Sequence, residues 1–159
     1  MEKFLAEDKA LKTVVGPVDL NTAAVTGARV NMAKAKRVTF IVVLAAGSST
    51  TGHVVTLRQH DAASSGNSAD LASDNPYYHK VGAATKFTKV VPGSAAAAKD
   101  IHALVGDSAS IVVFEVLAEE LTAGYGWVSV DTSDVGGAQI GTVLAVVDSE
   151  FKPAYEQIV

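Results

Sequence analysis

The chain has 159 residues, of which 48% are hydrophobic and 19% are charged, and its formal net charge is −4. This length fits one globular domain with a core of its own, and the composition excludes a disordered chain. The acidic balance, without any run rich in Lys or Arg, argues against a partner that is nucleic acid. The absence of cysteine excludes disulfides and cysteine-ligated zinc.

The N-terminus does not have the pattern of an export signal. Residues 1–9 carry charges where a signal peptide needs an apolar segment. The longest apolar runs have the length of a strand and are far shorter than a membrane-spanning helix. We therefore expect synthesis and assembly in the cytoplasm, with no membrane as partner.

The first residues predict a short N-terminal arm. Residues 1–12 suit a short helix whose apolar members are Phe4, Leu5 and Leu11. An isolated helix of this length is marginal in water, so it either docks on something or frays as a mobile terminus. The sharper of the two interpretations is an arm that lies on a neighbouring subunit.

Residues 37–45 are the clearest strand in the chain, β-branched and aromatic without Pro or Gly. Ile41 and Val43 make one face of this strand apolar, and the other face is formed by Val38, Phe40, Val42 and Leu44. A strand that is apolar on both faces must be covered on both faces. We therefore expect it in the middle of a β-sandwich, or in a sheet whose second face is covered by another subunit. Residues 111–117 repeat the same pattern.

Seven or eight short strands with little helix follow Gly16-Pro17, where the chain is expected to turn into its domain. This spacing favours an all-β fold, an antiparallel β-sandwich that is jelly-roll-like, over an α/β fold. The expected division is an N-terminal arm, 1–17, and a β-sandwich domain, 18–159. We expect strand 53–60 to form a hairpin with the strand at 37–45, and the strands at 37–45 and 111–117 to be central, one in each sheet.

Two further predictions concern the stretch before the strand at 111–117. Residues 85–91 are expected to form a strand with Phe87 as its anchor. Residues 94–101 favour a helical turn or two because of their alanines.

No catalytic or metal-binding pattern is present in the sequence. His53 and His60 are an odd number of residues apart in one expected strand, so they point to opposite faces and do not share a metal. His79 and His102 have no carboxylate at ligand spacing, and motifs for a nucleophile, a phosphate loop or a calcium loop are missing or incomplete. We therefore expect a protein that is not an enzyme, with no catalytic residue, metal or cofactor.

Aromatic residues gather beside the expected turns, at Tyr77, Tyr78, Tyr125 and Trp127. They either cap the ends of the core or contact another subunit or a glycan, since aromatic residues are enriched at such contacts. The candidate intersubunit contacts are Phe4, Leu5, Leu11, Tyr77, Tyr78, Trp127 and Tyr155.

Several segments look familiar in combination. They are 19–21 (DLN), 37–44 (RVTFIVVL), 56–63 (TLRQHDAA), 75–90 (NPYYHKVGAATKFTKV), 111–117 (IVVFEVL) and 152–155 (KPAY). Together they resemble small virion structural proteins encoded in the head gene clusters of tailed bacteriophages, from about Val18 to the C-terminus.

The resemblance implies a component of the virion, and specifically a head cement or decoration protein. Such a protein binds the outer capsid surface across capsomer junctions and stabilises the shell, with the major capsid protein as its partner. A homo-oligomer, a dimer or a trimer, is expected because it would cover the second face of one sheet. Two alternatives stay open at this point: a tail-tube or other tail structural protein, and a glycan-binding module.

Overall fold

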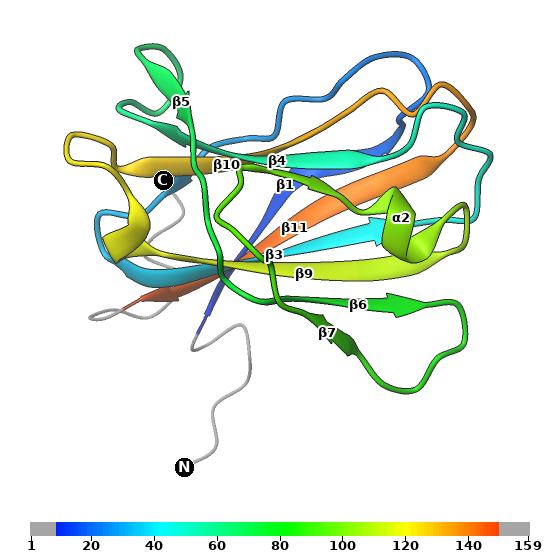
Figure 1. Ribbon diagram of the computed structural model, residues 1–159. Helices are drawn as coiled ribbons and strands as arrows, with labels where there is room; N and C mark the ends of the chain where they lie inside the picture. The colour runs from blue at the N-terminus through cyan, green and yellow to red at the C-terminus, as the bar shows by residue number, and fades with distance from the viewer. Residues whose placement is uncertain (1–8, 150–159) are drawn as a thin grey trace.

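The computed structural model describes residues 9–149, which fold into two antiparallel sheets packed face to face (Figure 1). The all-β sandwich expected from the sequence is therefore confirmed. The candidate contacts Phe4, Leu5 and Tyr155 lie outside the described residues. In chain order, the elements are β1 (Ala10–Asp19), β2 (Val30–Asn31), β3 (Ala35–Leu44), β4 (Val54–His60), β5 (Ser68–Asp70), β6 (Tyr77–Val81), β7 (Thr88–Val90), β8 (Ala98–Asp100), α2 (His102–Val105), β9 (Ser110–Leu117), η1 (Ala118–Glu120, a 3₁₀ turn), β10 (Trp127–Thr132) and β11 (Ile140–Ser149).

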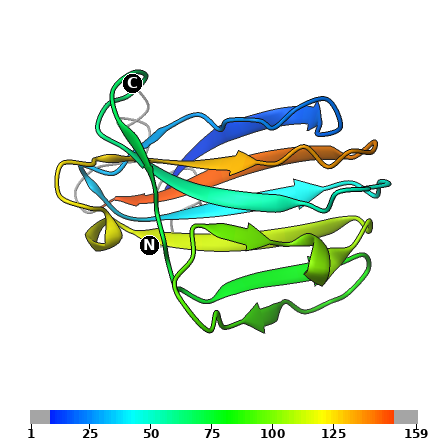
Figure 2. The same ribbon diagram turned by 45° about the horizontal axis from the view of Figure 1, so that its top comes forward.

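The larger sheet, sheet A, has the strand order β1-β11-β3-β9-β6-β7. The smaller sheet, sheet B, has the order β2-β10-β4-β5, and β8 also pairs with β4. Figure 2 shows β1 and β7 at opposite edges of sheet A. The two strong strands of the sequence, β3 and β9, are neighbours in the middle of sheet A.

The core lies between the two sheets and is built mainly from valine. Phe40 on β3 is completely buried, and its neighbours across the strands are Ala145 on β11 and Phe114 on β9. The Phe114 ring stacks on Tyr77 with centroids 5.1 Å apart. A small residue on one side of Phe40 and an aromatic one on the other let the large side chain fill a thin core. Sheet B contributes Val55, Leu57, Val128 and Val130.

The expected hairpin of residues 37–45 with 53–60 is wrong. β3 belongs to sheet A and β4 to sheet B, so the chain between them crosses from one sheet to the other. This crossing loop lies against the loop that precedes β11, with the Ser48 amide donating to the Ala138 carbonyl. A Cβ on Gly137 would lie 1.5 Å from the Ser48 carbonyl oxygen, so only glycine allows this approach.

The prediction that the two strong strands sit in different sheets is also wrong, because β3 and β9 pair along eight residues. Each of the two strands packs one apolar face against sheet B, and this packing does not require them to lie in separate sheets.

Residues 10–12 are strand, not helix, and β1 pairs with β11 from Ala10 to Asp19. Residues 10–17, expected in the arm, therefore belong to the sandwich, because pairing with β11 satisfies their backbone groups in a way that a lone helical turn does not. Residues 98–100 are likewise strand, β8, because they pair with the open side of β4.

Candidate interaction face on sheet A

The outer face of sheet A, the side turned away from sheet B, carries a continuous band of apolar side chains. On the central strands the inward residues are almost fully buried, whereas the outward residues that alternate with them are half-buried. The outward apolar residues are Ile41 and Val43 on β3, Ile111 and Val113 on β9, and Leu144 and Val146 on β11. No second sheet of the described chain covers this side.

The strand register places these side chains in rows across the sheet. Leu144, Ile41, Val113 and Tyr78 lie opposite one another in turn on β11, β3, β9 and β6. Residues that are directly opposite in an antiparallel sheet have Cβ atoms about 5 Å apart, so this row is a continuous apolar contact surface. The rows on either side are shorter, with Val43 and Ile111 in one and Val146 in the other. Natural sheets of single soluble domains usually present a polar outward face, and this band departs from that pattern.

Charged residues form a ladder at the end of the outer face where β3 begins. The Arg37 guanidinium lies 3.2 Å from the Asp148 carboxylate and 3.6 Å from that of Glu115, and Lys9 also pairs with Asp148. The hydrogen bond from Lys9, with added attraction from Arg37, holds the pKa of Asp148 below its usual value. These pairs join β1, β11, β3 and β9 on the surface and bound the apolar band on this side.

A shallow apolar hollow of about 210 Å³ lies at the β6–β7 edge of the band and is lined by Tyr78, Phe87 and Val113. Phe87 is 47% exposed, so it is not the core anchor that the sequence predicted. The Lys80 ammonium lies 5.9 Å from the centre of the Phe87 ring. Lys89 is directly opposite Tyr78, and Lys86 precedes Phe87. Within residues 9–149, no ion pair joins these three lysines to a carboxylate.

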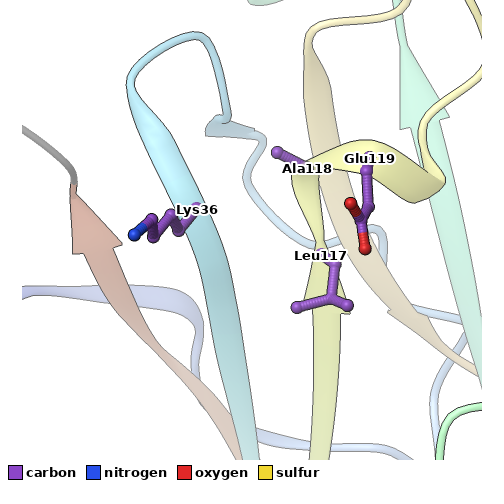
Figure 3. A pocket seen from close by; sticks show the side chains of 4 residues that line it. All are labelled: Lys36, Leu117, Ala118 and Glu119. Carbon is purple, nitrogen blue, oxygen red and sulfur yellow. The ribbon is translucent and has the colours of Figure 1, made fainter.

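A second hollow, of about 360 Å³, lies where β9 ends and is lined by Lys36, Leu117, Ala118 and Glu119. Figure 3 shows that the Lys36 side chain points away from the side chains of Leu117 and Glu119. The ammonium and the carboxylate therefore do not converge on one point, as a site that binds or converts a polar ligand would require.

His60 is buried in a polar cluster that fastens sheet B. Its Nδ1 lies 2.7 Å from the Ser68 hydroxyl and its Nε2 lies 2.9 Å from the Ser129 hydroxyl. The Ser129 hydroxyl in turn donates to the Asp131 carboxylate at 3.3 Å. Both ring nitrogens are thus used in holding β4 to β5 and β10, and burial lowers the pKa of His60.

A second polar cluster fastens the ends of the two sheets around Glu120. One carboxylate oxygen accepts from the Leu117 amide and from the Asn75 side chain, both at 2.7 Å, and the other accepts from the Ser73 hydroxyl at 2.8 Å. The Lys99 ammonium donates to the Ser73 carbonyl at 2.7 Å, and burial lowers the pKa of this lysine. The cluster ties η1 to the segment that leads into β6.

Replacing Glu120 with glutamine is expected to lower the free energy of unfolding by about 1–3 kcal/mol, because the new amide group meets donors where the carboxylate accepted from them. Denaturant unfolding measures this difference. Glu119→Gln is the matched control, since the neighbouring carboxylate is exposed and the same change there is expected to cost about 0.5 kcal/mol or less. Equal losses in the two variants would contradict the role assigned to Glu120.

The structure separates the sequence-derived candidate contacts. Leu11, which is 49% exposed, and Tyr78 lie on sheet A, but on strands four places apart. Tyr77 is buried in the core against Phe114, so it caps the core, and Trp127 lies half-buried on β10 of sheet B. Tyr77, Tyr78 and Trp127 therefore do not form one aromatic platform of the kind that a glycan-binding module uses.

Sequence reasoning found the apolar outward residues of β3 but missed Phe87 and the lysines around it. Lys80 and Lys89 are nine residues apart and become neighbours only because β6 and β7 form a hairpin. A signal was available in the alternation of Tyr78 with Lys80, which places both on one face of a strand.

Among residues 9–149, no group of three or more His, Asp or Glu side chains is arranged to hold a metal ion. No helix within those residues has both the length and the apolar character needed to cross a membrane.

The comparisons with known proteins add little. No family model matches the chain, and no curated protein sequence matches it. Among solved structures, one similar chain comes from work titled "Bacillus endospore appendages form a novel family of disulfide-linked pili". The identity is 10%, the TM-score is 0.31, and the match covers 95% of this chain and 98% of the other. A TM-score this low carries no argument about function.

Proposed function

We propose that this protein is a structural subunit of a bacteriophage virion, and specifically a head cement protein. In this role many copies bind the outer capsid surface across the junctions between major capsid proteins and hold the shell together. The proposal combines the resemblance of the sequence to phage head proteins with one observation, the apolar band on the outer face of sheet A.

The band supports a role in assembly because a single soluble domain usually carries polar residues on such an outward face. The apolar side chains lie on four neighbouring strands, β11, β3, β9 and β6, in three rows. Neighbouring strands are about 4.8 Å apart and alternate residues about 6.8 Å, so the band spans about 19 by 20 Å. Covering such a face removes roughly 400 Å² from each partner, about half of what each partner buries in a specific interface of standard size. A single contact of this size is weak, and repetition over a symmetric shell makes it strong.

Binding to heads tests the proposal. The purified protein is incubated with expanded heads of the same phage that lack it, and binding is measured by co-sedimentation. The wild-type chain is expected to bind, and Ile41→Lys is expected to bind at least about tenfold more weakly, because a charge is placed in the middle of the apolar band.

Thr56→Lys is the matched control, since Thr56 is also β-branched and half-buried on a central strand, but on the outer side of sheet B. It is expected to bind as the wild type does. Equal binding by Ile41→Lys and wild type would overturn the use of this face. Failure of the wild type to bind heads, with rings or tubes formed by the protein alone, would favour a tail protein instead.

A further inference from the structure

The lysine-rich hollow at the β6–β7 corner has no occupant among the described residues, and its chemistry limits what fits it. Its walls, Tyr78, Phe87 and Val113, are apolar. Lys80 and Lys89 lie beside it and Lys86 precedes Phe87 in the chain, with no carboxylate paired to these lysines in residues 9–149. A complementary ligand therefore has one or two bulky apolar groups flanked by negative charges.

The N-terminal segment of this chain, residues 1–8, has that chemistry. Phe4 and Leu5 are adjacent apolar residues, and Glu2, Glu7 and Asp8 flank them. With a single lysine, Lys3, the segment carries a net charge of −2. Its sequence is thus complementary in charge and in polarity to the corner of the outer face.

The distance from Lys9 to the hollow bears on whether this segment binds the hollow of its own chain or that of a second copy. The register places Lys9 level with Leu117 of β9, three strands away, and Val113 is four residues further along β9. With strands about 4.8 Å apart and a rise of about 3.4 Å per residue, Lys9 is about 20 Å from the nearest wall of the hollow.

An extended chain covers at most about 3.6 Å per residue, so Leu5 lies within about 14 Å of Lys9, and Phe4 within about 18 Å. The segment also has to reverse direction, because β1 runs from Lys9 toward the level of the hollow. To reach the hollow of its own chain the segment has to be almost fully extended and to reverse direction at once, whereas the hollow of a second copy sets neither condition.

From the charge, the apolar walls and this distance, we infer that residues 1–8 of one copy bind the Tyr78–Phe87–Val113 hollow of a second copy. The exchange links subunits through their arms, and it deepens the proposed function, on which it rests, by naming how neighbouring copies hold one another. The contact is salt-sensitive because the lysines and the acidic residues are on the surface.

Cysteine cross-linking of the isolated full-length protein tests the inference. Because the chain contains no cysteine, only the introduced cysteines can form disulfides. Leu5→Cys is mixed with Val113→Cys over micromolar to millimolar concentrations and oxidised, and the linked peptides are identified by mass spectrometry. We expect a disulfide between the two variants, and a double variant, L5C/V113C, that links between chains. Tyr78→Cys serves as a second wall position, and denaturant unfolding checks that each variant is folded.

Two controls separate the inferred contact from chance collision. Leu5→Cys mixed with Thr56→Cys, on the outer side of sheet B, is expected to link at background level. The charge reversal K80E/K89E is expected to lower the yield of the L5C–V113C link about fivefold, as the loss of two surface ion pairs predicts, whereas the exposed Lys34→Glu leaves it unchanged.

Several results would overturn the inference. Linking of L5C/V113C within one chain would show that the arm fills its own hollow, and equal yields with Thr56→Cys would show that the arm has no preferred site. Links between two V113C chains in place of L5C–V113C links would show that the face packs on the same face of another copy. Because no heads are present, failure here leaves the head-binding result standing, and failure of head binding leaves this result standing.

Discussion

Replacing Phe40 with alanine is expected to lower the free energy of unfolding by about 3–5 kcal/mol, the usual cost of truncating a fully buried aromatic residue. Phe40 has no exposed surface, and it fills the space between Ala145 and Phe114 at the centre of the core. Neither neighbour refills that space, because both are fixed in paired strands. Equilibrium unfolding in denaturant measures the loss as a lower midpoint with an unchanged slope.

Val42 and Val43 provide a matched control on the same strand. Val42 is 1% exposed and points into the core, whereas its neighbour Val43 is half-buried on the outer face. The change from valine to alanine removes the same atoms and the same strand preference at both positions. We expect Val42→Ala to cost about 2–3 kcal/mol and Val43→Ala about 1 kcal/mol or less.

The difference between the two valines bears on function. If the outer face contributes little to folding, its apolar side chains are free to be selected for contact with a partner. Equal losses at Val42 and Val43 would mean that the outer face is packed as tightly as the core. That result would contradict the assignment of this face to assembly.

Low pH is expected to have the second large effect on the stability of the fold. His53, at the start of β4, is 1% exposed, and neither ring nitrogen has a hydrogen-bond partner in the described chain. Burial, with a smaller contribution from the nearby charge of His102, lowers its pKa from 6.5 to about 4. Asp100 acts in the opposite direction and does not cancel these effects.

The folded pKa of His53 lies below the unfolded value, so the unfolded chain binds the proton more tightly. Its contribution to stability is complete above about pH 6.5 and is lost as the pH falls toward 4. This pKa difference lowers the free energy of unfolding by about 3 kcal/mol at pH 4 relative to neutral pH. We therefore expect unfolding in acid to begin well above the range in which exposed carboxylates titrate.

His53→Leu isolates this effect, because the other titrating groups are common to both proteins. The difference in unfolding free energy between variant and wild type is measured at pH 7.5 and at pH 4. It is expected to move by about 3 kcal/mol in favour of the variant at the lower pH. A difference that is independent of pH would show that His53 does not carry the acid sensitivity.

The sequence by itself determined the class of the fold, and it showed that the strands at 37–45 and 111–117 are apolar on both faces. Short β-branched segments without amphipathic helices lead to paired sheets, and Val38, Phe40 and Val42 alternate so regularly that their burial follows from strand geometry. The outward apolar residues Ile41 and Val43 could be predicted for the same reason. These features depend on neighbours within one strand, which the sequence displays directly.

Only the tertiary structure decided which strands pair and which surfaces result. Residues 45–53 suit either a hairpin or a crossing between sheets, and the choice depends on the approach of Gly137 to Ser48, far away in the chain. The lysine corner is likewise a product of pairing, because Lys80 and Lys89 meet only when β6 and β7 do. Long-range contacts of this kind leave no periodic trace in a sequence. The apolar face was therefore predictable, whereas its rows, its charged ladder and its hollow were not.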